Sequence, residues 1–198
     1  NTGGELSFGA GTGPGTDGAG ATTFTPVDRY NGLYLSGNVS GYALTLGRTI
    51  TATALTSTLQ VQSVAAWLDV YGVGIRLGFN ASGNAEARWV NPWATGSTVT
   101  SAAIYADGRT HTLAATLSND GAGTSTLRLY VDGVERGTAA TFATSGAGYL
   151  LPAFNSIMVG GTDYGDMFTG TISHVAGFAS ALTTQLADHH EAASGGFA

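Results

Sequence analysis

The sequence predicts an all-β domain, a sandwich or a barrel of many short strands with one short helix near the C-terminus. Apolar residues alternate with polar ones over many short segments, which is the period of a strand with one buried face. The 198 residues include 31 glycines, several of them in turn sequences between these segments. Only 10% of the residues are charged, against about 25% in ordinary soluble domains. Helical proteins usually build their polar faces from Lys and Glu, so this composition disfavours a helical fold.

The alternating segments follow one another from residue 32 onward, and β-branched and aromatic residues are frequent in them. The predicted strands contain Leu33 and Leu35, Tyr42 to Leu46, Leu59 and Val61 with Val64 to Leu68, and residues 74–80, 85–90, 113–117, 127–131, 157–160 and 170–178. The turn sequence Ala81-Ser82-Gly83-Asn84 separates two of these segments. Residues 74–90 are therefore predicted to form a hairpin.

A second hairpin is predicted around Asp132-Gly133, which stands between two apolar arms. An Asp-Gly pair in this context is typical of a two-residue type I′ turn. In the strand before the turn, Leu127 and Leu129 should face one side of the sheet, and Arg128 and Tyr130 the other. Further turns are expected at Asp107-Gly108 and at Asn119-Asp120-Gly121.

One segment, residues 183–193, has the spacing of a helix. Leu182, Leu186 and His189 or His190 recur at intervals of three to four residues, and Thr183 or Thr184 can cap the N-terminus.

The chain divides into a Gly-rich arm or linker at residues 1–27, a domain at 28–193 and a short tail at 194–198. The arm either is a flexible tail or adds a strand through Leu6 to Phe8, because Phe8 is an unusual residue to leave in water. The sequence starts at Asn1 without a basic and apolar leader, so we expect a mature or excised piece of a longer product.

Charge and composition exclude several classes of partner and site. A net charge of −6 and a pI near 4.9 disfavour binding to nucleic acid or to anionic membranes, which need clustered basic residues. The absence of Cys excludes disulfides, Cys-ligated metals and a Cys nucleophile. The uncharged stretch from Ile50 to Leu68 carries many Thr, Ser and Gln residues and does not resemble a membrane-spanning helix.

Three segments of the second half resemble, in order and spacing, the laminin-G-like, concanavalin A-like jelly-roll family. Residues 106–116 (ADGRTHTLAAT) resemble its DG-x-W-H-x-(V/L)-A-x-T strand. Residues 127–137 (LRLYVDGVERG) resemble its L-x-L-Y-V-D-G hairpin, and residues 158–183 resemble its closing V-G-G and F-x-G-x-I-D segments. The resemblance extends over about residues 30–192, more loosely in the first half. Thr110, Ser173 and Phe178 depart from the pattern, where Trp, an acid and Tyr are usual.

The resemblance implies a two-sheet antiparallel jelly-roll sandwich with one convex and one concave sheet. Ligands of the family bind on the concave face or in the loops at one rim. Related glycanases of this fold carry an E-x-D-x-x-E strand, which this sequence lacks, since Glu86 stands between Ala85 and Ala87 without a second acid. No Gly-x-Ser-x-Gly elbow occurs either. We therefore expect no catalytic residues.

The four histidines are interpreted as structural. His111 is expected to be partly buried in a strand with a hydrogen bond, and His174 also lies in a predicted strand. His189 and His190 are expected at an exposed helix end, because adjacent helical residues diverge by about 100° and do not easily share a metal.

Calcium is the candidate cofactor, because many laminin-G-like and pentraxin-like domains bind it at the rim. Calcium prefers six to eight oxygen ligands on loops. Asp163 and Asp166 lie in the loop where pentraxin-like relatives place acidic ligands, and Asp69 follows the strand that ends at Leu68. These three are candidate metal ligands, although the loop is short of acids and a solvated turn is the favoured interpretation.

Glycan binding would rely on aromatic rings that stack on sugars and on amides that bond to hydroxyl groups. The candidate ligand-binding residues are Trp93, Asn91, Trp89, Tyr71, Tyr105 and Tyr164. Trp93 follows Pro92 in a turn-like context. Trp89 alternates with Ala87, so core packing is the favoured interpretation and ligand binding the alternative, and Trp67 is expected in the core.

The leading functional hypothesis is a non-catalytic carbohydrate-binding and adhesion module of a secreted or phage virion protein, extracellular and directed at a cell-surface glycan. The alternative is a structural decoration or fibre module of a virion, which would bind other subunits or form a homo-oligomer. A glycoside hydrolase of the same fold comes third.

Overall fold

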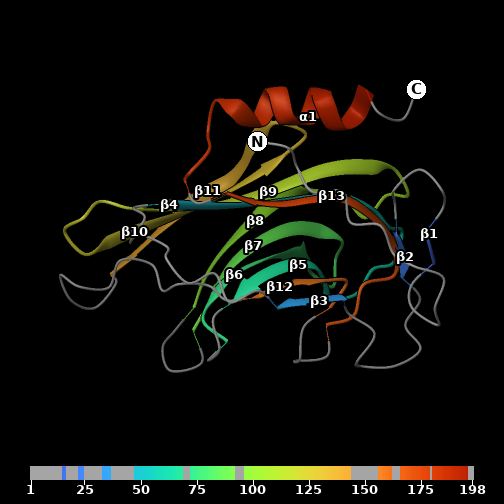
Figure 1. The fold of residues 1–198 in the computed structure, drawn as a ribbon, viewed down its shortest axis with the longest axis horizontal. Helices are drawn as coiled ribbons and strands as arrows, with labels where there is room; N and C mark the ends of the chain where they lie inside the picture. The colour runs from blue at the N-terminus through green and yellow to red at the C-terminus, as the bar shows by residue number, and fades with distance from the viewer. Residues whose placement is uncertain are drawn as a thin grey trace.

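The computed structural model describes residues 15–16, 22–24, 33–36, 47–68, 72–91, 96–143, 156–161, 166–178 and 180–195. These residues form two stacked sheets and one helix (Figure 1). The strands are β1 (Gly15–Thr16), β2 (Thr22–Phe24), β3 (Leu33–Ser36), β4 (Gly47–Leu55), β5 (Gln62–Leu68), β6 (Gly74–Phe79), β7 (Asn84–Val90), β8 (Ser97–Ile104), β9 (Thr110–Asn119), β10 (Thr124–Val131), β11 (Val134–Ala143), β12 (Ser156–Val159) and β13 (Gly170–Phe178), and the helix is α1 (Gln185–Gly195).

The two sheets have the crossed connections of a jelly roll. The seven-stranded sheet has the order β1-β2-β13-β4-β9-β10-β11, and the six-stranded sheet has the order β3-β12-β5-β6-β7-β8. The pairings are antiparallel, and strands far apart in sequence lie side by side, such as β4 with β13 and β5 with β12. The predicted all-β, two-sheet jelly-roll sandwich is therefore confirmed.

The core lies between the sheets and is built from alternate residues of each strand. In β4, Ile50, Ala52 and Ala54 face inward and are buried. In β6, Ile75 and Leu77 face them from the other sheet with no exposed surface. Burial of each large apolar side chain stabilises the fold by about 1.5–3 kcal/mol. The residues between them, including Arg76, point to the outer face of the six-stranded sheet.

The predicted hairpin at Asp132-Gly133 joins β10 to β11. Asp132 and Gly133 have φ angles of 53° and 74°, as a type I′ turn requires at both central positions. Leu127 and Leu129 are fully buried in the core, while Tyr130 packs on the opposite face of the sheet. The predicted register of this strand is thus confirmed.

Helix α1 lies across the outer face of the seven-stranded sheet (Figure 1). Leu186 is buried against Ala114 of β9 and Tyr130 of β10. The chain leading to the helix is held by Thr49, whose Oγ1 donates to the carbonyl oxygen of Ser180 at 2.8 Å and accepts the N–H of Leu182 at 2.8 Å. The helix begins two residues later than the sequence predicted. Among the described residues, no helix is long and apolar enough to cross a membrane.

Three details of the sequence prediction need correction or extension. Leu59 and Val61 are not in a strand, since they lie in the connection between β4 and β5, where Leu59 is 60% exposed. β4 and β8 were not predicted as strands. The Gly-rich arm contributes β1 and β2 to the seven-stranded sheet, whereas Leu6 to Phe8, as well as Tyr42 to Leu46 on the domain side, lie outside the described residues.

Candidate functional site

The outer face of the six-stranded sheet carries a group of charged side chains, which we call the charged cluster: Arg76, Glu86, Arg88 and Asp166. Arg76 of β6 stands directly opposite Arg88 of β7, and Glu86 lies two residues before Arg88 on the same face. Asp166 precedes β13, and its carbonyl oxygen accepts the backbone N–H of Ser63 in β5 at 2.8 Å. Three separate parts of the chain therefore bring these charges together.

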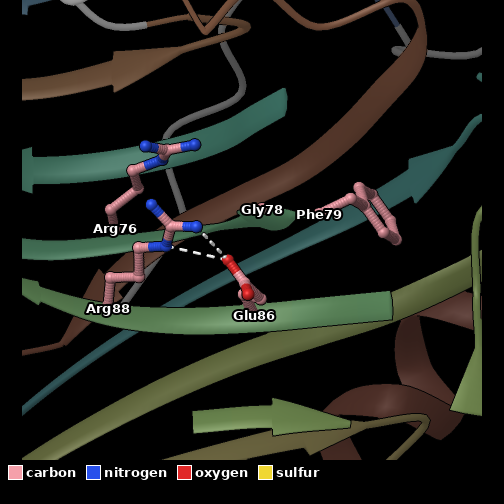
Figure 2. A pocket seen from close by; sticks show the side chains of 5 residues that line it. All are labelled: Arg76, Gly78, Phe79, Glu86 and Arg88. Carbon is pink, nitrogen blue, oxygen red and sulfur yellow. Dashed lines mark hydrogen bonds and ion pairs between the residues drawn. The ribbon is translucent and has the colours of Figure 1, made fainter. Parts of the chain in front are cut away.

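Two ion pairs hold the charged cluster, and Figure 2 shows the one between Arg88 and Glu86. The guanidinium of Arg88 donates from Nε to Glu86 Oε2 at 2.8 Å, and its Nη2 lies 2.5 Å from the same oxygen. The other carboxylate oxygen, Oε1, accepts a hydrogen bond from Thr100 Oγ1 of β8 at 3.1 Å. Arg76 forms an ion pair with Asp166 through Nη1. These contacts fix the positions of both arginines.

Burial differs across the charged cluster. Arg76 and Glu86 are 8% and 7% exposed, whereas a third of the side chain of Arg88 is exposed. Burial lowers the pKa of Arg76, and the neighbouring charge of Arg88 lowers it further, while Asp166 opposes both effects. Arg76 and Glu86 are therefore buried, and Arg88 is the member of the charged cluster whose side chain is most exposed.

A narrow hollow, too small to enclose a ligand, lies among Arg76, Gly78, Phe79, Glu86 and Arg88. The ring of Phe79 points away from the two guanidinium groups and into the core (Figure 2). Gly78 is required here, because a Cβ at this position would collide with the carbonyl oxygen of Gln62 in β5. The adjacent pairing of β5 with β6 is irregular between Ser63 and Ala65, which brings the two backbones close.

Beside the charges, the same face carries a small apolar group. Ala66, Leu68 and Met158 are buried together, and Val90 packs against them from β7. Ala66 and Arg76 are direct cross-strand partners. The charged side chains of this face thus lie next to a buried apolar group, at whose edge Val90 is partly exposed.

The two aromatic candidates among the described residues, Trp89 and Tyr105, do not lie on the charged cluster. Trp89 is 7% exposed and stacks on Phe142 at 5.7 Å in the core, so it presents no ring to a sugar. Its inclusion among the ligand-binding residues was wrong, because its position in β7 alternates with outward-facing Arg88. Tyr105 is half-buried and packs edge-on against His111 at 5.0 Å.

The other candidate ligand-binding residues lie near the end of β7 or outside the described chain. Asn91 follows Val90 and is half-buried. Trp93, Tyr71 and Tyr164 lie outside the described residues.

Of the three calcium candidates, only Asp166 belongs to the described residues. Asp163 and Asp69 lie outside the described residues. The carboxylate of Asp166 is engaged by Arg76, which makes it a poor ligand for a cation. Within the described ranges, no group of three or more His, Asp or Glu residues is arranged to hold a metal ion.

A second polar group surrounds His111 at the start of β9. Its Nδ1 lies 2.8 Å from Asp132 and its Nε2 3.1 Å from Asp107. The hydrogen bond to Asp132 raises the pKa of His111, against the effect of burial. Burial raises the pKa of Asp132, but the hydrogen bonds from His111 and from the N–H of Thr112 outweigh this effect. The pKa of this carboxyl is therefore lowered. The expected partly buried, hydrogen-bonded histidine is present.

Two further histidines occupy other positions. His190 lies within α1 and contacts Thr112 Oγ1 at 3.1 Å, so it packs against β9 and is not at an exposed helix end. His174 lies in β13 as predicted, is exposed, and has a φ angle of 50° where the pairing with β4 is irregular. Neither faces the charged cluster.

Sequence reasoning singled out neither Arg76 nor Arg88. The signal was nevertheless present, because both alternate with apolar residues in a predicted hairpin. Once the turn at residues 80–84 is placed, its register sets Arg76 opposite Arg88 on the polar face. Asp166 could not be added in this way, because it reaches Arg76 from a distant loop.

Comparisons with known proteins identify the fold family. A family model described as the concanavalin A-like lectin/glucanases superfamily matches residues 28–186. A search of curated protein sequences finds no match.

Solved structures with the same fold are distant in sequence. Domains LG4-5 of the mouse laminin alpha1 chain are 13% identical, with a TM-score of 0.62, and the match covers 87% of this chain and 45% of that one. The binding domain of botulinum neurotoxin serotype D is 11% identical, with a TM-score of 0.62 and coverage of 88% and 42%. This chain spans less than half the length of either. The CBM40 of a Ruminococcus gnavus IT-sialidase, solved with α2,3 sialyllactose, is 18% identical, with a TM-score of 0.52 and coverage of 76% and 83%.

Proposed function

Because this chain belongs to the concanavalin A-like lectin/glucanase superfamily, we propose that it is a non-catalytic glycan-binding module. Its ligand face is the outer face of the six-stranded sheet. It acts outside the cell, as part of a secreted or virion protein that attaches to cell-surface glycan.

The observation that carries this proposal is the charged cluster. Arginine and glutamate side chains are rarely buried unless they are paired, and here they are buried outside the core. Among the described elements, helix α1 packs on the seven-stranded sheet, and the partly exposed Arg88 and the exposed Thr98 give a ligand access to the charged cluster on the other sheet. The CBM40 structure bound to sialyllactose supports the proposal, as do the binding domains of the toxins.

The charged cluster does not have the form of a glycosidase site. Retaining and inverting glycosidases need two carboxyl groups that flank the scissile bond, one of them as a proton donor. Glu86 accepts hydrogen bonds on both oxygens, and Asp166 is paired with Arg76. The arrangement favours binding over hydrolysis.

Steric blocking of the open side of this face tests the proposal. Thr98 is exposed on β8 directly opposite Arg88, so Thr98→Trp should reduce glycan affinity at least tenfold. The matched control is Thr141→Trp, at an exposed position of β11 in the other sheet. Glycan arrays on the wild type select the ligand, and calorimetry then measures both variants.

Two outcomes would contradict the proposal. A wild-type protein that binds no glycan on the array, and that light scattering shows to be a tight trimer or larger, would favour the alternative of a structural virion or fibre module. Release of reducing sugar from a bound glycan would make the protein a hydrolase instead.

A further inference from the structure

We infer that Arg88, supported by Arg76, binds an oxyanion group of the ligand, so that the module prefers glycans that carry a carboxylate or a sulfate. This inference rests on the proposed glycan-binding function and names the ligand class for the same site.

The balance of donors and acceptors in the charged cluster leads to this ligand. A guanidinium group has five N–H donors and no acceptor. Within the described part of the chain, the carboxylate contacts use Nε and Nη2 of Arg88 and Nη1 of Arg76. Glu86 is already shared between Arg88 and Thr100. The site therefore has more donors than acceptors, and a ligand that supplies acceptor oxygens completes it.

Access from solvent selects Arg88 as the residue that touches the ligand. The hollow between the two arginines is narrow, and a third of the Arg88 side chain is exposed at its mouth. Thr98, the cross-strand partner of Arg88, is also exposed. Arg76 is 8% exposed and paired with Asp166, so it acts as a positioning residue that adds positive charge beneath the mouth.

The fixed geometry of Arg88 suits a planar or tetrahedral oxyanion. Its two bonds to Glu86 hold the guanidinium plane, so little side-chain entropy remains to be lost when a ligand binds. Arginine presents parallel donors that match a carboxylate or sulfate edge, which a lysine does not. The net charge of −6 acts over longer distances and is screened beyond about 8 Å in physiological salt, so it opposes binding of long polyanions more than of one local group.

Calorimetry with pairs of acidic and neutral sugars tests the inference. The probes are 3′-sialyllactose and lactose, a glucuronide and the matching glucoside, and 3-sulfated and unmodified galactoside. For the wild type we expect at least one acidic sugar to bind tenfold or more tightly than its neutral partner. The carboxylate and sulfate pairs separate the two sources of the oxyanion.

Substitution of Arg88 assigns the preference to this residue. Arg88→Gln should reduce the preference for the acidic sugar over its neutral partner about tenfold, since a hydrogen bond to a charged group is worth about that factor or more. The double variant Glu86→Gln with Arg88→Gln keeps a neutral, bonded pair if the single variant folds poorly. The control is Arg128→Gln, which breaks a similar ion pair with Glu135 on the other sheet.

The outcomes separate the two proposals. Equal affinity for acidic and neutral sugars in the wild type overturns the oxyanion inference and leaves glycan binding intact. An acidic preference that persists in both Arg88 variants also overturns it. Absence of binding to every probe and every arrayed glycan refutes the proposed function itself.

Discussion

The ion pair between His111 and Asp132 should make the stability of this domain depend on pH in a defined direction. We consider Asp132→Asn, which removes the charge and preserves most of the geometry. Asn also tolerates the positive φ of this turn position, and Asn-Gly is a favoured type I′ pair. Its amide oxygen can still accept the N–H of Thr112, as the carboxylate does at 2.9 Å.

The expected cost follows from the contact and its burial. His111 Nδ1 lies 2.8 Å from the carboxylate, and the two side chains are 12% and 30% exposed. Hydrogen bonds to charged groups contribute about 1.5–3 kcal/mol when well shielded. Partial exposure of Asp132 reduces this to about 1–2 kcal/mol at pH 5.5.

The sign of the pH dependence comes from both partners. The folded pKa of His111 is raised, so its contribution is complete below about pH 6.5 and is lost as pH rises through the higher folded value. The folded pKa of Asp132 is lowered, so its contribution is present above about pH 4 and is lost as pH falls through the lower folded value. The cost of Asp132→Asn is therefore largest between these limits and much smaller at pH 9.

Urea unfolding of wild type and variant at pH 5.5 and pH 9 measures this difference. Asp120→Asn is the control, because Asp120 also precedes a glycine and accepts the N–H groups of Ala122 and Thr124 but meets no histidine. Its effect should be the same at both pH values. An equal cost of Asp132→Asn at the two pH values would refute the argument that the ionic contact, and not the turn, stabilises this site.

Three further predictions concern the core, the helix and the metal. Leu129→Ala, at a position with no exposed surface, should lower the free energy of unfolding by about 2–5 kcal/mol in urea titrations. Gly133→Ala should cost about 1–3 kcal/mol and speed hydrogen exchange in α1, because φ is 74° and the new Cβ would lie 2.9 Å from Ala187 Cα. Since Arg76 engages the Asp166 carboxylate, Asp166→Asn should leave the response of Tm to calcium and EDTA as in the wild type, and loss of a calcium-induced rise would instead make Asp166 a ligand.

The parts of the fold that sequence predicted are those where large apolar residues alternate and glycine marks the turns. β10 is one example, because Leu127 and Leu129 alternate with Arg128 and so show the two-residue period of a strand. β4 was missed for the opposite reason. Its inward residues after Ile50 are Ala52 and Ala54, which give little hydrophobic contrast with the threonines between them, and the side chains on both faces of the strand are buried.

The candidate site was predicted less well, because it depends on contacts across strands and loops. Register alone could have paired Arg76 with Arg88. No local pattern connects Asp166 to Arg76, since the two are brought together only when the chain before β13 passes the end of β5. Trp89 illustrates the reverse error, in which an aromatic residue with a plausible binding role belongs to the core face of its strand.

The charged cluster is the feature that stability alone explains least. A buried ion pair repays its desolvation only in part, and an apolar pair of similar volume is often as stable or more stable. The neighbouring Ala66, Leu68 and Met158 show that apolar packing is possible on this same face. The arginines and carboxylates beside them therefore stand where apolar side chains could have packed. Such departures from stable packing concentrate at functional sites. Among the described elements, α1 packs on the seven-stranded sheet, whereas the charged cluster, with its partly exposed Arg88, lies on the other sheet, which no described helix covers.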